Sequence, residues 1–132
     1  MLAARRGVNV KVIMPLHSDV RLVDFLRDKY MGFYYKNGIK LHFYTPGNLH
    51  AKCLLIDNQV FAIGSANFDY RSFRYQHEIV LVGTDPRIQH LIKAHLDETM
   101  LNCEGFNMES WLRRPLIQKL FGWLLIPFRH LF

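Results

Sequence analysis

The sequence has few cysteines and few acidic residues, and each scarcity narrows the possible classes of protein. Only 2 of its 132 residues are cysteines, and the spacing of Cys53 and Cys103 fits no metal site. Cys53 lies inside an apolar run, so we expect a buried free thiol and a reducing, cytosol-facing environment. Asp and Glu number 11 against 17 Lys and Arg, which gives a net charge of +6. A basic balance favours anionic partners such as phospholipid headgroups or nucleic acid, although this charge is also ordinary for a small domain.

The sequence also lacks an apolar run of transmembrane length, a signal peptide, internal repeats and low-complexity segments. Hydrophobic residues make up 50% of the chain, which at this length is enough for one domain with its own core. The segment from Ala3 to Gly7 is typical of the last turn of a helix that ends at glycine. Since such a helix would begin before Met1, we expect the chain to be a fragment of a longer protein.

Hydrophobic periodicity predicts strands and helices that alternate along the chain. Strands are expected at 8–14, 39–44 and 78–82, and a further pair forms a hairpin between residues 49 and 67. Helices are expected at about 20–37, at about 86–102 with Asp85 as the cap, and at 109–113. This order predicts an α/β fold in which helices flank a mixed β-sheet.

Residues 115–132 form an apolar tail, which Pro127 interrupts. Its basic residues and flanks are Arg113, Arg114, Lys119, Arg129 and His130. The tail is too short to span a bilayer. An aromatic-rich apolar segment with basic flanks is typical of an interfacial membrane helix. The same segment could instead pack on its own domain or on a partner, and both interpretations stay open.

His50 and Lys52 are the first candidates for a reactive site. They lie two apart in a segment with strand character, so both side chains are expected on the same face. A neutral imidazole can attack phosphorus, and an imidazolium can protonate a leaving oxygen. An ammonium group beside the ring can hold a non-bridging phosphate oxygen.

A hairpin turn would bring further polar side chains to this pair. With a two-residue turn at 58–59, Lys52 lies opposite Ser65 and His50 lies opposite Asn67. Asn67 and Ser65 could then donate hydrogen bonds to the same phosphate, although Ser65 could also serve only to shape the backbone. The predicted patch has donors and a cation but no evident set of metal ligands.

Two residues of the same segment are expected to be structural. Asp57 is an odd number of positions from His50, so it faces the other way, and we expect it at the turn rather than in the reaction centre. Gly64 is expected to shape the backbone before Ser65.

The pattern His-x-Lys-x4-Asp-x6-Gly-Ser-x-Asn, which begins at His50, resembles the signature of the phospholipase D superfamily. The segment 68–74, with Glu78 after it, is similar to the bacterial cardiolipin synthases in particular. The resemblance implies a phospholipase D-like half-domain at residues 1–114. It also implies that Glu78 orients His50 by accepting the proton of Nδ1. Arg71 is a candidate for contact with the substrate headgroup or for support of the site, unless it only forms an ion pair.

The resemblance implies a function as well. Enzymes of this family combine two such motifs, one from each of two similar halves, and this chain carries one. It resembles the second half of a cardiolipin synthase, whose histidine usually acts as the acid. A second half-site would come from a homodimer or from a missing amino-terminal half.

The implied reaction is phosphatidyl transfer between two phosphatidylglycerol molecules through a phosphohistidine, with no metal or cofactor. The expected location is the membrane surface of a bacterial cell, with the catalytic part facing the cytosol. The alternatives are another phosphodiesterase of the superfamily, either a phospholipase or a homodimeric nuclease, or an inactive orphan half-domain. Nucleic acid is the less expected partner because a nuclease has no need of the apolar tail.

Overall fold

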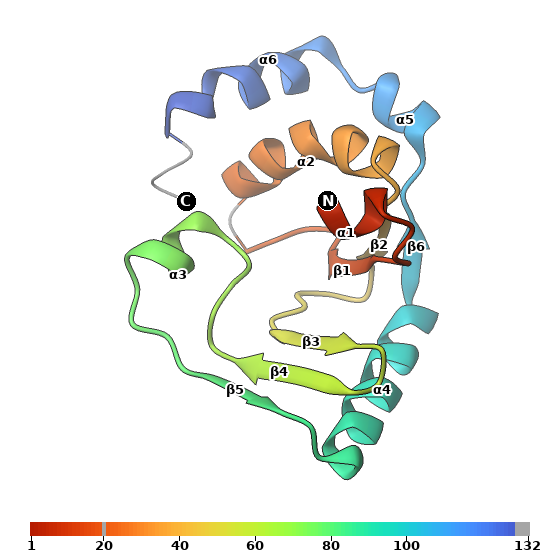
Figure 1. Cartoon of the computed structure of the whole chain (residues 1–132). Coiled ribbons are helices and arrows are strands. Elements are labelled where there is room, and N and C mark those ends of the chain that lie inside the picture. Colours follow the sequence, from red (N-terminus) through yellow and green to blue (C-terminus); the bar gives the residue numbers. More distant parts are fainter. Residues whose placement is uncertain (20, 129–132) are drawn as a thin grey trace. The chain divides into compact units, whose positions relative to one another are not determined.

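The fold is described from a computed structural model in which residues 1–19 and 21–128 are described. The expectations that concern Val20, Arg129 and His130 lie outside these residues. The chain divides into two compact units. Within the described residues, the first unit contains 1–49 and 102–128, and the second contains 50–101 (Figure 1).

The first unit is built on a mixed sheet with the strand order β1-β2-β6. β1 and β2 pair in parallel, and β6 pairs antiparallel to β2. The parallel pair requires a crossover, which α2 provides. The elements of this unit are α1 (Leu2–Arg5), β1 (Lys11–Pro15), α2 (Arg21–Lys36), β2 (Lys40–Tyr44), β6 (Cys103–Gly105), α5 (Met108–Leu112), α6 (Leu116–Leu124) and the short 3₁₀ helix η1 (Ile126–Phe128).

The core of the first unit lies between β2 and α2. Leu41 and Phe43 alternate with more exposed residues along β2, and they pack with Met31 of α2. Trp111 of α5 is packed against the same cluster. A Cβ at Gly32 would lie 2.5 Å from the Trp111 ring, so only glycine lets α5 approach α2 this closely.

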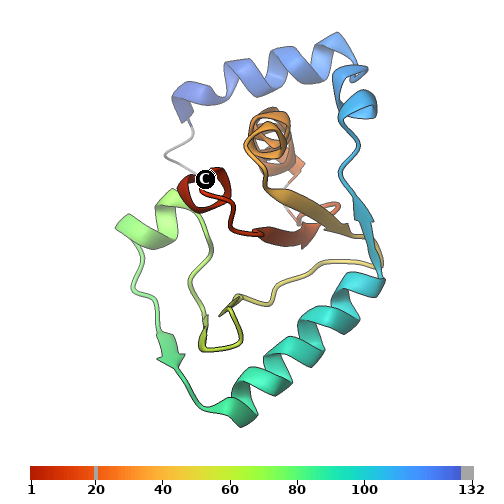
Figure 2. The same cartoon turned by 45° about the vertical axis from the view of Figure 1, so that its right-hand side comes forward.

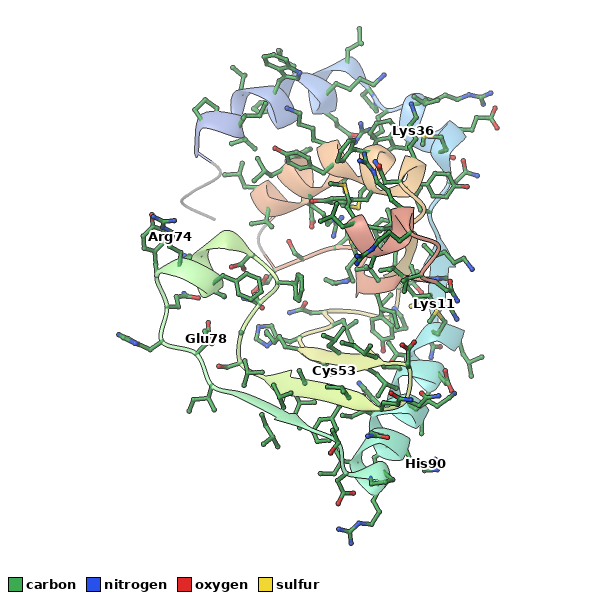
Figure 3. All side chains as sticks on the ribbon, in the orientation of Figure 1. Lys11, Lys36, Cys53, Arg74, Glu78 and His90 are labelled. Carbon is green, nitrogen blue, oxygen red and sulfur yellow. The ribbon has the colours of Figure 1, made fainter. Side chains whose placement is uncertain are left out.

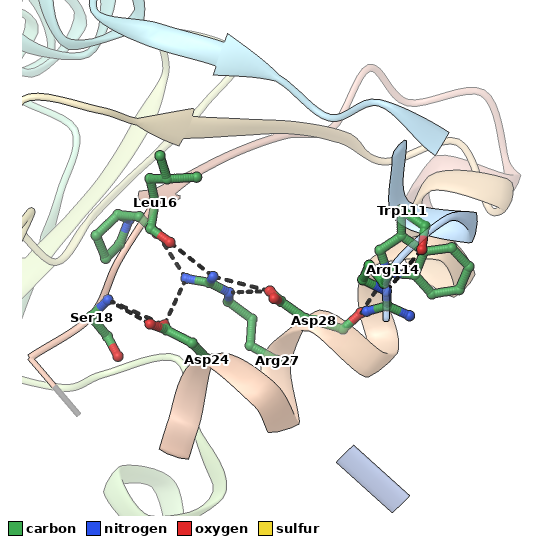
Figure 4. A network of polar contacts seen from close by, with 8 residues as sticks. Leu16, Ser18, Asp24, Arg27, Asp28, Trp111 and Arg114 are labelled. Atoms are coloured by element: carbon green, nitrogen blue, oxygen red, sulfur yellow. Dashed lines mark hydrogen bonds and ion pairs between the residues drawn. The ribbon is translucent and has the colours of Figure 1, made fainter. Parts of the chain in front are cut away.

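A polar network joins the middle of α2 to its surroundings (Figure 4). Arg27 donates to the carbonyl oxygens of Pro15 (2.7 Å) and Leu16 (3.0 Å), and thereby satisfies backbone acceptors at the end of β1. Further along α2, the carbonyl oxygen of Asp28 accepts from Trp111 Nε1 at 2.6 Å and from Arg114 Nη1 at 2.7 Å. Two charged and one aromatic donor therefore hold β1, α2 and the segment from α5 to Arg114 together.

The second unit is built on an antiparallel sheet with the strand order β3-β4-β5. Its elements are β3 (Cys53–Ile56), β4 (Val60–Gly64), α3 (Tyr70–Arg74), β5 (Val80–Gly83) and α4 (Pro86–Leu101). Phe61 is 2% exposed, and its ring occupies the space that a Cβ at Gly83 would need. Gln89 of α4 donates to the carbonyl oxygen of Gln59 at 2.7 Å, which ties the helix to the hairpin turn.

The predicted α/β class is confirmed, with helices flanking mixed β-structure. The strands form two three-stranded sheets instead of the one expected. β1 includes Pro15, and the strand expected at 78–82 begins only at Val80. Asp85 caps α4 as predicted, because its carboxylate accepts from the backbone N–H groups of Arg87 and Ile88.

The predicted tail contains α6, and this helix lies alongside α2 in both views (Figures 1 and 2). Among the described residues, no helix combines the length and the apolar character that crossing a membrane would require.

Candidate active site

The hairpin of β3 and β4 carries the site, but its turn is longer than predicted. Ile56 pairs with Val60, so residues 57–59 form a three-residue connection. Asp57 and Asn58 have φ angles of 51° and 52°, a left-handed conformation that Asp and Asn adopt more readily than most residues. The backbone N–H of Gln59 donates to the Ile56 carbonyl at 2.9 Å and closes the turn.

This turn corrects the predicted register. The N–H of Gly64 donates to the carbonyl oxygen of Lys52 at 3.1 Å, so Lys52 lies beside Gly64 and not opposite Ser65. The expected pairing of His50 with Asn67 is shifted in the same way. One additional residue in a turn exchanges the two faces of a strand, because side chains alternate with a period of two. The single patch expected from a two-residue turn is therefore not formed by cross-strand pairing.

His50 and Lys52 nevertheless form a close pair. Both precede β3, which begins at Cys53, so the alternation of a strand does not set their direction. Lys52 Nζ lies 2.7 Å from His50 Nδ1 and donates to the carbonyl oxygen of His50 at 2.9 Å. An ammonium group has only donors, so Nδ1 must be the acceptor and Nε2 carries the ring proton. This tautomer presents an N–H group to a ligand oxygen.

Glu78 pairs with Ser65 in the structure. It lies on the segment between α3 and β5 (Figure 3). The Ser65 hydroxyl donates to Glu78 Oε2 at 2.5 Å and accepts from the N–H of Ile79 at 3.1 Å. Within the described part of the chain no hydrogen bond joins Glu78 to His50, whose Nδ1 faces Lys52. The predicted contact of Glu78 with Nδ1 is thus replaced by a contact with Ser65.

Gly64 allows the backbones of β4 and the segment before β5 to meet. A Cβ at this position would lie 2.2 Å from the carbonyl oxygen of Ile79. The N–H of Ser65 donates to the same oxygen at 3.0 Å. The glycine therefore lets Ser65 reach the segment that carries Glu78.

The loop that carries Asn67 is organised by Ser72, a residue that sequence reasoning did not select. Ser72 is 5% exposed; its hydroxyl accepts from the N–H of Asn67 at 3.3 Å and donates to Gln76 Oε1 at 3.1 Å. Asp69 caps α3 by accepting from the N–H of Ser72 at 2.7 Å. The available signal was Asp69 as a candidate helix cap, which locates the start of α3 but does not indicate the role of the Ser72 hydroxyl.

The remaining candidates lie at the surface. Asn67 and Arg71 are exposed, and Arg71 takes part in none of the ion pairs found among the described residues. Burial raises the pKa of the Cys53 thiol, so this residue is not disposed to act as a thiolate nucleophile. In residues 1–19 and 21–128, no group of three His, Cys, Asp or Glu side chains could hold a metal ion.

The site thus consists of two polar pairs, His50 with Lys52 and Ser65 with Glu78, and of an exposed Asn67 two residues after Ser65. It offers one imidazole, one fixed cation and several hydrogen-bond donors. Such a set can bind an oxyanion and exchange a proton with an oxygen atom. A double displacement with an acid and a nucleophile needs a second group, which this set does not contain.

Comparisons with known proteins agree with this picture. Residues 1–100 match the family described as "Cardiolipin synthase, PLD-like domain". The chain belongs to this family. Cardiolipin synthase A of Pseudomonas putida strain W619 is 42% identical over 119 residues, and that of Pseudomonas fluorescens strain SBW25 is 37% identical over 121 residues. These alignments cover 90% and 89% of this chain but 25% of each relative, so the chain spans about a quarter of the curated relatives it matches.

Two solved structures resemble the fold. Nuc from Salmonella typhimurium, a phospholipase D family member, superposes with a TM-score of 0.67 at 21% identity. NucT from Helicobacter pylori gives a TM-score of 0.54 at 25% identity. The matches cover 80% and 79% of this chain and 69% of each of those chains. The phospholipase D-like fold that the motif implied is therefore confirmed.

Proposed function

We propose that this chain supplies one half-site of a phosphatidyltransferase that converts two phosphatidylglycerol molecules into cardiolipin and glycerol. The observation that carries the proposal is the His50–Lys52 pair on a half-domain of this family. The curated relatives named cardiolipin synthase A support the choice of substrate. The proposed setting is the surface of a bacterial membrane, with the catalytic part facing the cytosol.

The reaction would proceed in two displacements. A histidine nitrogen attacks the phosphorus of the donor lipid, the bond from phosphorus to the glycerol oxygen breaks, and a second histidine protonates that oxygen. The second histidine then removes the proton from a hydroxyl of the acceptor lipid. The resulting oxygen displaces the nitrogen from phosphorus, which yields cardiolipin and regenerates both imidazoles.

The contact of His50 with Lys52 supports the acid–base role for His50. A ring that is protonated at Nε2 cannot attack phosphorus through that atom, but it can donate to the leaving oxygen. The charged phosphate is a better acceptor for the ammonium group than Nδ1 is. We therefore expect Lys52 to turn to the phosphate on binding, which frees Nδ1 to take up the second proton that an acid requires.

The proposed roles of the other site residues follow from this arrangement. Asn67 donates to a phosphate oxygen, Arg71 contacts the headgroup, and Glu78 orients His50 once Nδ1 is protonated and attracts a carboxylate. The nucleophile comes from a second half-site, which is either a second copy of this chain or a separate amino-terminal half.

The test is product formation by the purified chain in phosphatidylglycerol vesicles, measured by mass spectrometry of the lipids. Wild type, His50→Ala and His90→Ala are compared. His90 is an exposed histidine of α4, so its replacement controls for the loss of a histidine outside the site. Cardiolipin from wild type and His90→Ala, with a loss of about a thousandfold or more in His50→Ala, is the expected result for a self-pairing chain.

A self-pairing phosphodiesterase is the second candidate. It is favoured by the fold, because Nuc, a phospholipase D family member, superposes on this chain with a TM-score of 0.67. Phosphatidic acid and glycerol without cardiolipin would identify this activity and reject the transferase. A folded monomer that forms neither product would exclude self-pairing. Addition of an amino-terminal half of a cardiolipin synthase A then tests the half-site itself, and continued absence of product would reject the transferase.

A further inference from the structure

Helix α6 has one face that is held against α2. The rings of Phe121 and Phe25 lie 6.1 Å apart. Gly122 is buried, and a Cβ there would lie 3.1 Å from the Phe25 carbonyl oxygen. These contacts fix the rotation of α6 about its axis, so its opposite face points away from α2.

The outward face of α6 consists of large apolar side chains. They are Leu116, Ile117, Leu120, Trp123 and Leu124, and each is between 58% and 80% exposed. The side chains of Leu116, Ile117, Leu120 and Trp123 line one shallow groove with Lys119. A contiguous apolar face on so short a helix marks an interaction surface, unlike single apolar residues scattered over a protein.

The charged residues of the segment that contains α6 are all basic, although Arg113 is paired with Glu109. Between Ser110 and Phe128 the sequence contains no Asp or Glu. Arg113 and Arg114 precede the helix, Lys119 lies within it, and Lys29 of α2 lies over the Trp123 ring at 5.0 Å from its centroid. The surface therefore combines an apolar strip with a basic border, which complements an anionic surface with an apolar layer beneath it.

The positions of Lys119 and Trp123 suit the boundary between lipid headgroups and the apolar layer. Lys119 donates to the carbonyl oxygen of Leu112 at 2.8 Å, so its ammonium lies at the amino-terminal end of the helix while its stem lines the groove. Trp123 carries an indole N–H on a large apolar ring, a combination enriched at the headgroup level of membranes.

We propose that the outward face of α6 docks on an anionic phospholipid bilayer, with the helix lying in the interfacial layer and Lys29, Arg113 and Lys119 at the headgroups. The proposal rests on α6 and its neighbours and not on the catalytic motif. It holds whether or not the chain transfers phosphatidyl groups, and the test measures binding, not turnover.

The first measurement is flotation of the full chain with vesicles of phosphatidylcholine alone or mixed with phosphatidylglycerol. Binding to the mixed vesicles is expected, with weaker binding to neutral vesicles and at raised salt concentration. Leu120→Glu should weaken binding about tenfold or more, because it removes an exposed leucine that docking would bury in the bilayer and places a carboxylate at the interface. Leu91→Glu on α4 is the matched control, since Leu91 is also exposed, at 67%, and it should bind like wild type.

A second measurement detects docking in the wild-type chain, so it does not depend on whether a variant folds. The chain has 2 tryptophans, and Trp111 is held inside the first unit by its hydrogen bond to Asp28. Vesicles with bromine on the lipid chains should quench the emission of Trp123 and leave that of Trp111. In Trp123→Phe the quenching should disappear.

Three results would overturn the proposal. One is the absence of vesicle binding and quenching in wild type. Another is equal binding by Leu120→Glu and Leu91→Glu. The third is a wild-type dimer that does not bind vesicles and that Leu120→Glu dissociates, because a second copy of the chain would then cover this face.

Discussion

Gly64→Ala tests whether the close approach of two backbones builds the candidate site. The new Cβ would lie 2.2 Å from the Ile79 carbonyl oxygen and 2.8 Å from the Val80 Cα, whereas ordinary contact begins at 3.4 Å. Relief of the contact with the Ile79 oxygen requires a displacement of about 1.2 Å, which is the difference between 3.4 Å and 2.2 Å. Both contacts involve backbone atoms, so no side chain can rotate to make room.

The displacement has a calculable cost. It breaks the two shorter hydrogen bonds between Ser65 and the backbone of Ile79, each worth about 1 kcal/mol. Residual overpacking adds roughly 1–2 kcal/mol, and the lower entropy of the unfolded alanine chain returns about 0.4–1 kcal/mol. We therefore expect the variant to lose about 2–3 kcal/mol of unfolding free energy.

The assay is urea unfolding followed by circular dichroism, with hydrogen exchange of the Ser65 and Ile79 amides as a local measure. Gly47→Ala is the matched control, because a Cβ at Gly47 meets no atom within 4 Å and its effect should stay within about 0.5 kcal/mol. Equal stability and equal exchange rates in the two variants would refute the account of Gly64.

Two further predictions concern the side chains of Ser72 and His42. Ser72→Ala should cost about 1–2 kcal/mol and speed amide exchange at Asn67, because it removes the hydrogen bonds of the buried hydroxyl to Asn67 and Gln76. Ser110→Ala, at an exposed serine, is the control, and equal exchange in both would contradict the role of Ser72. The pKa of His42 is lowered by burial and then by Lys11 and Lys40, so the folded state binds this proton less readily than the unfolded state. The contribution of His42 to the free energy of unfolding should be fully present above the ordinary pKa of 6.5 and decrease as the pH falls below it. Urea midpoints between about pH 5 and pH 8 measure this, and the midpoint of His42→Leu should depend less on pH than that of wild type. Parallel pH profiles of the two proteins would disprove the prediction.

The sequence predicted the elements of the fold because their signals are local. Apolar periodicity located α2 and α4, and the Asp85-Pro86 pair marked the start of α4. The division of the strands into two sheets was not predictable in this way. β6 pairs with β2 across about 60 residues, and no local pattern indicates which of two sheets a short strand joins.

The register of the hairpin could not be obtained from its turn residues. Asp57, Asn58 and Gln59 are all compatible with turns of two or three residues. The choice between these lengths reverses the face of every side chain in one strand. A prediction that identifies the correct hairpin can therefore still assign its polar residues to the wrong face.

The motif residues lie together for a reason other than strand pairing. His50 and Lys52 precede β3, Ser65 and Asn67 follow β4, and Glu78 precedes β5. All five lie at strand ends, where loop hydrogen bonds set the side-chain directions instead of the alternation of the sheet.

This placement explains how an incorrect register could accompany a correct set of residues. Lys52 is fixed by its contact with His50, and Ser65 by its contacts with Glu78 and Ile79. Gly64 and Ser72 support these loops without offering a reactive group of their own. Replacement of either should therefore disturb the site through the backbone, and a change in amide exchange should accompany any loss of activity.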